Sequence, residues 1–208
     1  MGIGWSLVPE MALSFDEEAM WQRLETFEVA GRKVSQLCPA DQLLLLCFNG
    51  AKDCWQRLDR VCDISELLRS HPQANWSEAI GRAEQTGALR MMLMGIALAK
   101  ELLEAPIPPE LNTALQRDPV AAAMVPQIRS KLARPITLLD LQGRFAPLLL
   151  HLKLRERWSD RVRYCAARIS PTVGDWVALP LPNSLSFLYY ALRPMRLALR
   201  SMGKGRLA

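Results

Sequence analysis

Apolar residues recur at helical spacing through most of the chain. In residues 43–48, leucines, a cysteine and a phenylalanine would surround a helix on all sides, which is typical of a central helix. Other periodic runs cover residues 55–68, 76–83, 88–103, 110–117 and 120–132. The pattern therefore predicts an array of helices in which 88–103 is a second long apolar element.

Residues with known helix-end preferences mark several boundaries of this array. Pro39 lies in the first turn of the helix that follows Cys38, and Asp41 lies near its positive end. His71-Pro72 ends the helix over 55–68, and Asn75 caps the next one. These signals predict short connections between neighbouring helices.

The last third of the chain continues the helical pattern with interruptions. Residues 137–169 predict a second long helical region with a break near Pro147. Residues 171–183 are rich in proline and predict a loop, and 184–202 predict a final helix kinked at Pro194.

The first residues predict a small β element. The apolar stretch 3–8 ends at Pro9 and fits an edge strand. Ser14 to Glu17 has the pattern of a capping box, and the helix it begins carries Met20, Trp21 and Leu24 on one face. Two short alternating segments, 27–30 and 33–37, flank Gly31-Arg32 and predict a hairpin.

The predicted fold class is therefore mainly α: a multi-helix array with a small N-terminal β element, made of an edge strand and a short hairpin. We expect three parts. Residues 1–37 hold the strand, a helix and the hairpin, 38–133 form a helical core domain, and 134–208 form a basic helical C-terminal region. The length of 208 residues is enough to bury a core.

Charge is distributed unevenly along the chain. The net charge is +5, but residues 1–128 carry −6 and residues 129–208 carry +11. Such asymmetry indicates that the C-terminal part faces something anionic, such as a phosphate-bearing ligand, a nucleic acid or a membrane surface. The acidic first part of the chain itself is the structural alternative.

The five cysteines and two histidines limit metal and redox chemistry. No two cysteines have the C-x-x-C spacing, and two histidines are too few for a histidine-rich metal site. Cys47, Cys54 and Cys62 are spaced like one stripe of a helix, so we interpret them as buried thiols. An odd number of thiols, with no signal peptide and no run long enough to span a membrane, predicts a cytoplasmic protein.

Two long stretches resemble a known family. GRKVSQLCPADQLLLLCFNGAKDCWQRLDRVCDISELL and WSEAIGRAEQTGALRMMLMGIALAKELLEAPIPPEL are similar to the centre of an uncharacterised nucleotidyltransferase family that often accompanies bacterial polysaccharide-synthesis genes. The ending RISPTVGDWVALPLPNSLSFLYYALRPMRLALR also resembles it. The most specific stretches are 49–68 and 179–197.

The resemblance implies a catalytic half that precedes these helices in longer family members. That half is of the polymerase-β type, with a Gly-Ser turn and carboxylates that hold Mg with a nucleoside triphosphate. Where the family's last strand carries a carboxylate before a tryptophan, this chain has Gly2, Ile3 and Gly4 before Trp5. The sequence also lacks a Gly-x-Gly-x-x-Gly, a Walker loop and a Gly-x-Ser-x-Gly. We therefore expect no catalytic residue and no cofactor in this chain itself.

Candidate ligand residues follow from the same resemblance. Where the family usually has two histidines this chain has Asn49 and Asp53, while Lys52, Trp55, Arg57 and Asp63 match the pattern. Lys52 would meet phosphate as a point charge, and on one continuous helix Asp63 would lie about three turns further along the same groove. The structural alternatives are an ion pair or solvated lysine, and a core tryptophan at Trp55.

The second candidate set is Arg193, Arg196 and Arg200 on the last predicted helix. Their spacing places them on one face, where they would hold an anionic ligand or lie on an anionic membrane above Phe187, Tyr190 and Leu197. A solvated basic face is the alternative. Nucleic acid ranks lower as a partner because the charge comes with no recognised binding motif.

Two functions are consistent with these observations. The first is a truncated or split nucleotidyltransferase-family protein, inactive alone and working with a separately encoded catalytic half. The second is a non-enzymatic binding or scaffold protein of surface-polysaccharide assembly, docked to a partner or membrane through its basic C-terminal region. A third, an unrelated enzyme that uses Cys54 or Cys165, would need a base beside the thiol.

Overall fold

The computed structural model of the chain describes residues 16–132 and 145–169. Within these two ranges the chain forms nine α-helices and one two-stranded antiparallel sheet, so the mainly helical prediction is confirmed. The strand predicted at 3–8, the loop at 171–183 and the helix at 184–202 lie outside the described residues.

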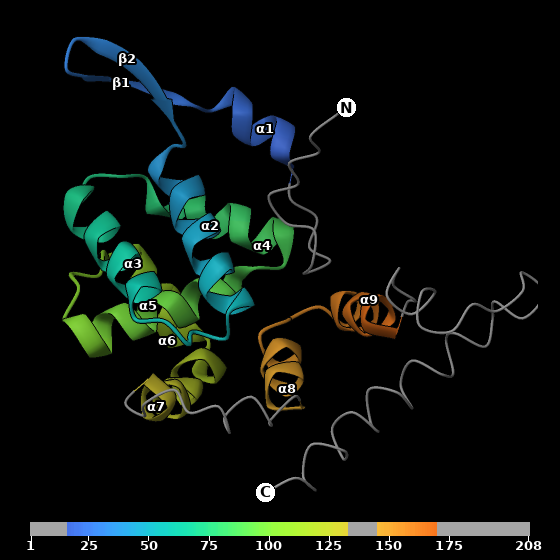
Figure 1. Ribbon diagram of the computed structural model, residues 1–208. Coiled ribbons are helices and arrows are strands. Elements are labelled where there is room, and N and C mark those ends of the chain that lie inside the picture. The colour runs from blue at the N-terminus through green and yellow to red at the C-terminus, as the bar shows by residue number, and fades with distance from the viewer. Residues whose placement is uncertain (1–15, 133–144, 170–208) are drawn as a thin grey trace, which may run out of the picture.

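The helices between residues 39 and 132 follow one another with short connections, as the capping residues predict (Figure 1). Their bounds are α1 Glu17–Gln22, α2 Pro39–Lys52, α3 Asp59–Ser70, α4 Trp76–Thr86, α5 Leu89–Leu103, α6 Pro109–Arg117, α7 Pro119–Leu132, α8 Phe145–Lys153 and α9 Trp158–Ile169.

The hairpin predicted near the N-terminus is present and stands apart from the helices (Figure 1). Strand β1 is Glu25–Val29 and strand β2 is Arg32–Gln36, with Phe27 opposite Val34. The turn is Ala30-Gly31, one residue earlier than predicted, because both residues have positive φ (50° and 77°), as a tight two-residue hairpin turn requires.

Helix α1 begins at a different cap from the predicted one. Asp16 is the N-cap, and its Oδ1 accepts the backbone N–H of Ala19 at 3.0 Å, so the prediction of Ser14 as the cap is wrong. Met20 is buried as predicted, but Trp21 is 56% exposed. In a six-residue helix only a few side chains can contact the rest of the protein, and Trp21 is not one of those that are buried.

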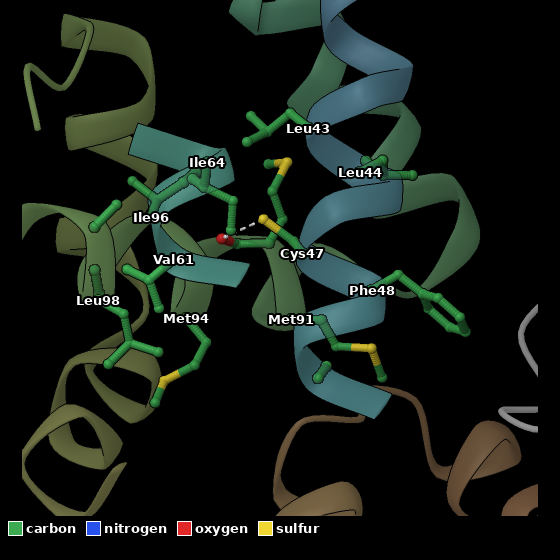
Figure 2. Packing of buried hydrophobic residues seen from close by; sticks show 14 of the residues in the cluster. Leu43, Leu44, Cys47, Phe48, Val61, Ile64, Met91, Met94, Ile96 and Leu98 are labelled. Carbon is green, nitrogen blue, oxygen red and sulfur yellow. Dashed lines mark hydrogen bonds between the residues drawn. The ribbon is translucent and has the colours of Figure 1, made fainter. Parts of the chain in front are cut away.

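The hydrophobic core forms where α2, α3 and α5 pack against one another. Figure 2 shows Leu43 and Cys47 of α2 directed at the same interior as Ile64 of α3 and Met94 of α5. The Cys47 thiol donates to the carbonyl oxygen of Met92 at 3.6 Å, the dashed line in the figure. The predicted central position of 43–48 and the predicted long apolar helix over 88–103 are therefore confirmed.

The connection between α2 and α3 departs from the predicted helix over 55–68. Cys54 and Trp55 both adopt left-handed conformations (φ 53° and 55°), which redirect the chain before α3 begins at Asp59. The predicted single stripe of cysteines is therefore wrong. Cys47 and Cys54 are buried, but Cys62 of α3 is exposed.

Helices α4 and α5 are separated where the sequence predicts. The Asn75 side chain accepts the N–H of Glu78, and Gly87 ends α4 in a left-handed conformation that glycine adopts readily. Further on, the described part of the 137–169 region is interrupted at 154–157, between α8 and α9, and Pro147 lies in the first turn of α8. The residues that precede Phe145 lie outside the described ones. A proline in the first turn of a helix costs it no hydrogen bond.

The described part of the basic C-terminal region packs on the core. Leu150 and Leu154 belong to the same hydrophobic cluster as α2, α3 and α5. In the described ranges, no helix combines the length and the apolar character that crossing a membrane requires.

Candidate functional site

The residues predicted from the family resemblance lie around the end of α2 and the start of α3. Lys52 is the last residue of α2 and is exposed, and Asn49 is partly buried one turn earlier. Asp63 is exposed on α3. The premise of one continuous helix carrying Lys52 and Asp63 is wrong, because the turn at 54–58 separates α2 from α3.

Trp55 lies in the core. Its side chain is fully buried, and a Cβ placed on Gly95 would come within 2.6 Å of its ring atom Cη2. The ring therefore fills a space lined by α2 and α5, where no face is open to a stacking ligand.

Arg57 is held by a neighbour in sequence. Its Nε donates to Asp59 Oδ1 at 3.1 Å and its Nη2 to Asp59 Oδ2 at 2.5 Å. This hydrogen bond, with the accompanying charge, raises the pKa of Arg57, and the same bond lowers the pKa of Asp59. Both side chains are exposed, so the pair contributes little to the fold.

Arg193, Arg196 and Arg200 lie outside the described residues. In the described part of the same basic region, Arg155 is fully buried and Arg157 donates to the carbonyl oxygen of Glu84 at 2.7 Å. Some of the positive charge of this region therefore contacts the protein itself.

A different group of charged side chains meets at the start of α2. Asp41 is 2% exposed and receives two arginines from other elements. Arg23, which follows α1, donates through Nε to Oδ2 at 3.1 Å and through Nη2 to Oδ1 at 3.3 Å. Arg82 of α4 lies 2.8 Å from Oδ1 through Nη1. One buried carboxylate therefore fixes two guanidinium groups beside each other.

Arg82 has two further partners. It forms an ion pair with Glu78 one turn earlier on α4, and its Nη1 lies 3.1 Å from the sulfur of Cys38. Burial by itself would lower the pKa of Arg82, but the contacts with Cys38 and Asp41 outweigh burial and raise it. Arg82 is therefore a fixed positive charge, held in place from α2 and α4.

These side chains line a cavity of about 390 Å³ between α1, α2 and α4. Asp16, Arg23, Asp41, Glu78 and Arg82 supply its charged groups, and Gln85 and Thr86 add polar groups from α4. Met20 and Leu44 supply apolar surface. A concave site with a few convergent polar groups is the usual form of a small-ligand site.

No motif in the sequence predicts this cavity. Asp41 matched the preference for acidic residues at helix N-termini, which explains it without any partner. Arg23 and Arg82 lie 18 residues before and 41 residues after it and belong to no motif. Only the packing of α1 and α4 against α2 brings the three together.

The described residues do not fit the metal that the family resemblance implies. Across residues 16–132 and 145–169, no three His, Cys, Asp or Glu side chains are grouped so that they could hold a metal ion. Asp41 itself is occupied by two arginines.

A second cavity of about 640 Å³ lies between α4, α5, α6 and α7. Glu156 enters it from the connection between α8 and α9 and accepts the backbone N–H of Arg90 at 2.5 Å. Burial raises the pKa of Glu156, and the contacts with Arg90 only partly offset this. Arg90 also donates to Asp118 at 2.7 Å, so charged side chains already partner one another around this space.

Comparison with known proteins identifies the first part of the chain. Residues 2–104 match the family of uncharacterised nucleotidyltransferases. The first half of the chain is therefore similar to these nucleotidyltransferases, and every residue of the Arg23–Asp41–Arg82 cavity lies within the matched stretch. Neither a curated protein nor a solved structure gives a significant match.

Proposed function

We propose that this protein is the helical, substrate-side part of a nucleotidyltransferase-type system, and that the Arg23–Asp41–Arg82 cavity holds the phosphate groups of its substrate. The observation that carries the proposal is the position of this cavity wholly within the residues that match the family. The larger cavity extends through α6 and α7 to Glu156, beyond the matched residues.

The chemistry of the cavity suits a phosphate. Guanidinium groups bind phosphate oxygens through pairs of N–H donors in a fixed plane. Asp41 orients two such groups in advance, which reduces the entropy lost when a ligand binds. The carboxylates of Asp16 and Glu78 at the same cavity suit hydroxyl groups of a sugar, because ionised carboxylates accept hydrogen bonds.

Catalysis of nucleotidyl transfer would need metal-binding carboxylates from outside the described helices. We propose that they come from another part of the protein or from a separately encoded catalytic half, and that Mg and the nucleoside triphosphate bind there. The family resemblance supports this arrangement and also supports a bacterial role in polysaccharide biosynthesis, and the odd number of cysteines supports a cytoplasmic location.

A transfer assay tests this proposal. The purified full chain is incubated with magnesium and each radiolabelled nucleoside triphosphate, with polysaccharide-type sugars as acceptors. We expect no transfer without a second protein. Transfer by the chain alone would overturn the proposal that it is inactive by itself. The reading frames next to its gene would show whether a metal-binding half is encoded separately.

The charge of the chain supports a second candidate function. The net charge of +11 over residues 129–208 fits a scaffold protein that docks on anionic lipid through Arg193, Arg196 and Arg200. Flotation with vesicles containing phosphatidylglycerol compares the natural chain with a variant in which all three become Glu. Equal flotation of the two proteins would rule out docking through these arginines.

A further inference from the structure

A cysteine and a histidine that are 97 residues apart meet where α8 packs on the core. Cys54 Sγ lies 3.5 Å from His151 Nε2. Cys54 belongs to the left-handed turn after α2, and His151 lies on α8. The two side chains are 6% and 5% exposed, so the contact is nearly closed to bulk water.

The histidine is held firmly in this position. Its ring packs against Tyr164 of α9, with the ring centroids 5.4 Å apart. Its carbonyl oxygen accepts Arg155 Nη1 at 2.8 Å, and the guanidinium of Arg155 lies 3.9 Å from the centre of the Tyr164 ring. Arg155 is fully buried, which places a positive charge one helical turn from His151.

Three further titratable groups surround Arg155. Tyr164, Asp160 and Cys165 each interact with it electrostatically, although burial is the stronger influence and lowers the pKa of Arg155. Asp160 is itself buried, and Lys52, two residues before Cys54, is exposed. The Cys54–His151 contact therefore belongs to a buried polar cluster, between the α2–α3 turn and α8–α9, that also includes Arg155, Asp160 and Tyr164.

This environment separates Cys54 from the other described thiols. Cys47 is enclosed by apolar side chains, donates to Met92 O, and has its pKa raised far above the ordinary value by burial. Such a thiol is inert. Cys62 is exposed on α3 and provides an ordinary surface thiol for comparison.

We propose that Cys54 is a site of oxidation by hydrogen peroxide, with His151 as the base that activates the thiol. The Cys54 proton passes to His151 Nε2, and the thiolate sulfur attacks one peroxide oxygen. The S–O bond forms as the O–O bond breaks, and the departing hydroxide takes the proton from the imidazolium to become water. Sulfur loses two electrons, peroxide gains them, and the product is a sulfenic acid.

Peroxide is the oxidant of choice here because of its size. It is little larger than water, so it can reach a side chain that is 6% exposed when larger electrophiles cannot. The inference is independent of the phosphate cavity, because neither Cys54 nor His151 lines it.

The experiment treats the full chain with hydrogen peroxide for timed intervals, removes the peroxide and unfolds the protein in urea with dimedone, which then traps sulfenic acid at every cysteine. Mass spectrometry quantifies each cysteine peptide. We expect Cys54 to be labelled faster than exposed Cys62, and His151→Gln to slow Cys54 by at least about tenfold while Cys62 is unchanged. A Cys54→Ser variant identifies the peptide. Faster labelling of Cys62, or an unchanged rate at Cys54 in His151→Gln, would overturn the proposal.

A pH series on the natural chain keeps the test valid if His151→Gln does not fold. With His151 as the base, labelling of Cys54 levels off below the ordinary cysteine pKa of about 8.5. Labelling of Cys54 that still rises through this pH would contradict the role of His151.

Discussion

The Trp55 ring lies against the backbone of Gly50. The backbone N–H of Trp55 donates to the Gly50 carbonyl oxygen at 2.8 Å, and a Cβ at position 50 would lie 2.5 Å from ring atoms Cε3 and Cη2. Real Cβ atoms do not approach carbon this closely. The absence of a side chain at Gly50 is therefore what allows the chain to turn after α2 with a fully buried indole.

Gly50→Ala should destabilise the fold by roughly 1–3 kcal/mol, because the ring has no space into which it can move. Urea unfolding followed by tryptophan fluorescence measures the change. Gly81→Ala is the matched control, since Gly81 lies within α4 and a Cβ there meets nothing within 4 Å. That control should be neutral or gain about 0.5–1 kcal/mol. Equal losses for the two variants would contradict the described packing.

Asp41→Asn should cost roughly 2 kcal/mol of stability, because Arg23 and Arg82 would lose the charge that compensates theirs. The free energy of unfolding in urea reports this loss. Glu101→Gln provides the comparison, because Glu101 pairs with Arg129 at 2.6 Å but both are exposed, and it should change stability by less than about 0.5 kcal/mol. If the two variants lose the same amount, Asp41 is not the centre of a buried network.

The raised pKa of Glu156 predicts that the stability of the fold depends on pH. Burial raises the pKa of Glu156 in the folded protein above its unfolded value, so between these two values the folded state binds more protons. Stability contributed by the group therefore falls as pH rises through that window. Glu156→Gln should remove this fall while Gln still accepts the Arg90 N–H. Melting temperatures at pH 4.5 and 7.5 test this, and a variant penalised more at pH 7.5 than at pH 4.5 would refute it.

The two candidate ligand positions on α2 can be separated by experiment. Asp41 and Lys52 lie eleven residues apart on one helix, which is roughly 16 Å along its axis, so one phosphate cannot contact both ends. We expect Lys52→Gln and Arg57→Gln to leave the affinity for a hexose phosphate unchanged and Arg23→Gln to weaken it, as measured by calorimetric titration. Loss of affinity in Lys52→Gln alone would move the site to the end of α2.

The helices were predictable because their signals are local. Apolar spacing defines α2 and α5, and the residues Asn75 and Gly87 mark the ends of α4 by their own conformational preferences. The turn at Cys54 and Trp55 was not predictable, because two non-glycine residues adopt positive φ there against their preference. Burial of the Trp55 ring between Gly50 and Gly95 supports that conformation, and it depends on the packing of α5.

The charged cavity and the Cys54–His151 contact were beyond the sequence for the same reason. The presence of Asp41 is already explained by the preference for acidic residues at helix N-termini, and neither Arg23 nor Arg82 belongs to a motif. The histidine that a reactive cysteine would need is 97 residues from Cys54. Each pairing exists only because distant helices pack together, whereas family resemblance directed attention to residues adjacent in sequence.

The most direct test of the proposed substrate cavity is calorimetric titration of a hexose phosphate, without metal, into the natural full chain and two variants. Arg82→Gln removes a guanidinium that Asp41 holds in the cavity, whereas Arg129→Gln removes one from an exposed pair elsewhere. We predict binding to the natural chain and to Arg129→Gln, with affinity at least about tenfold weaker in Arg82→Gln. Equal affinity in Arg82→Gln and the natural chain, or no binding to either, would contradict the proposal.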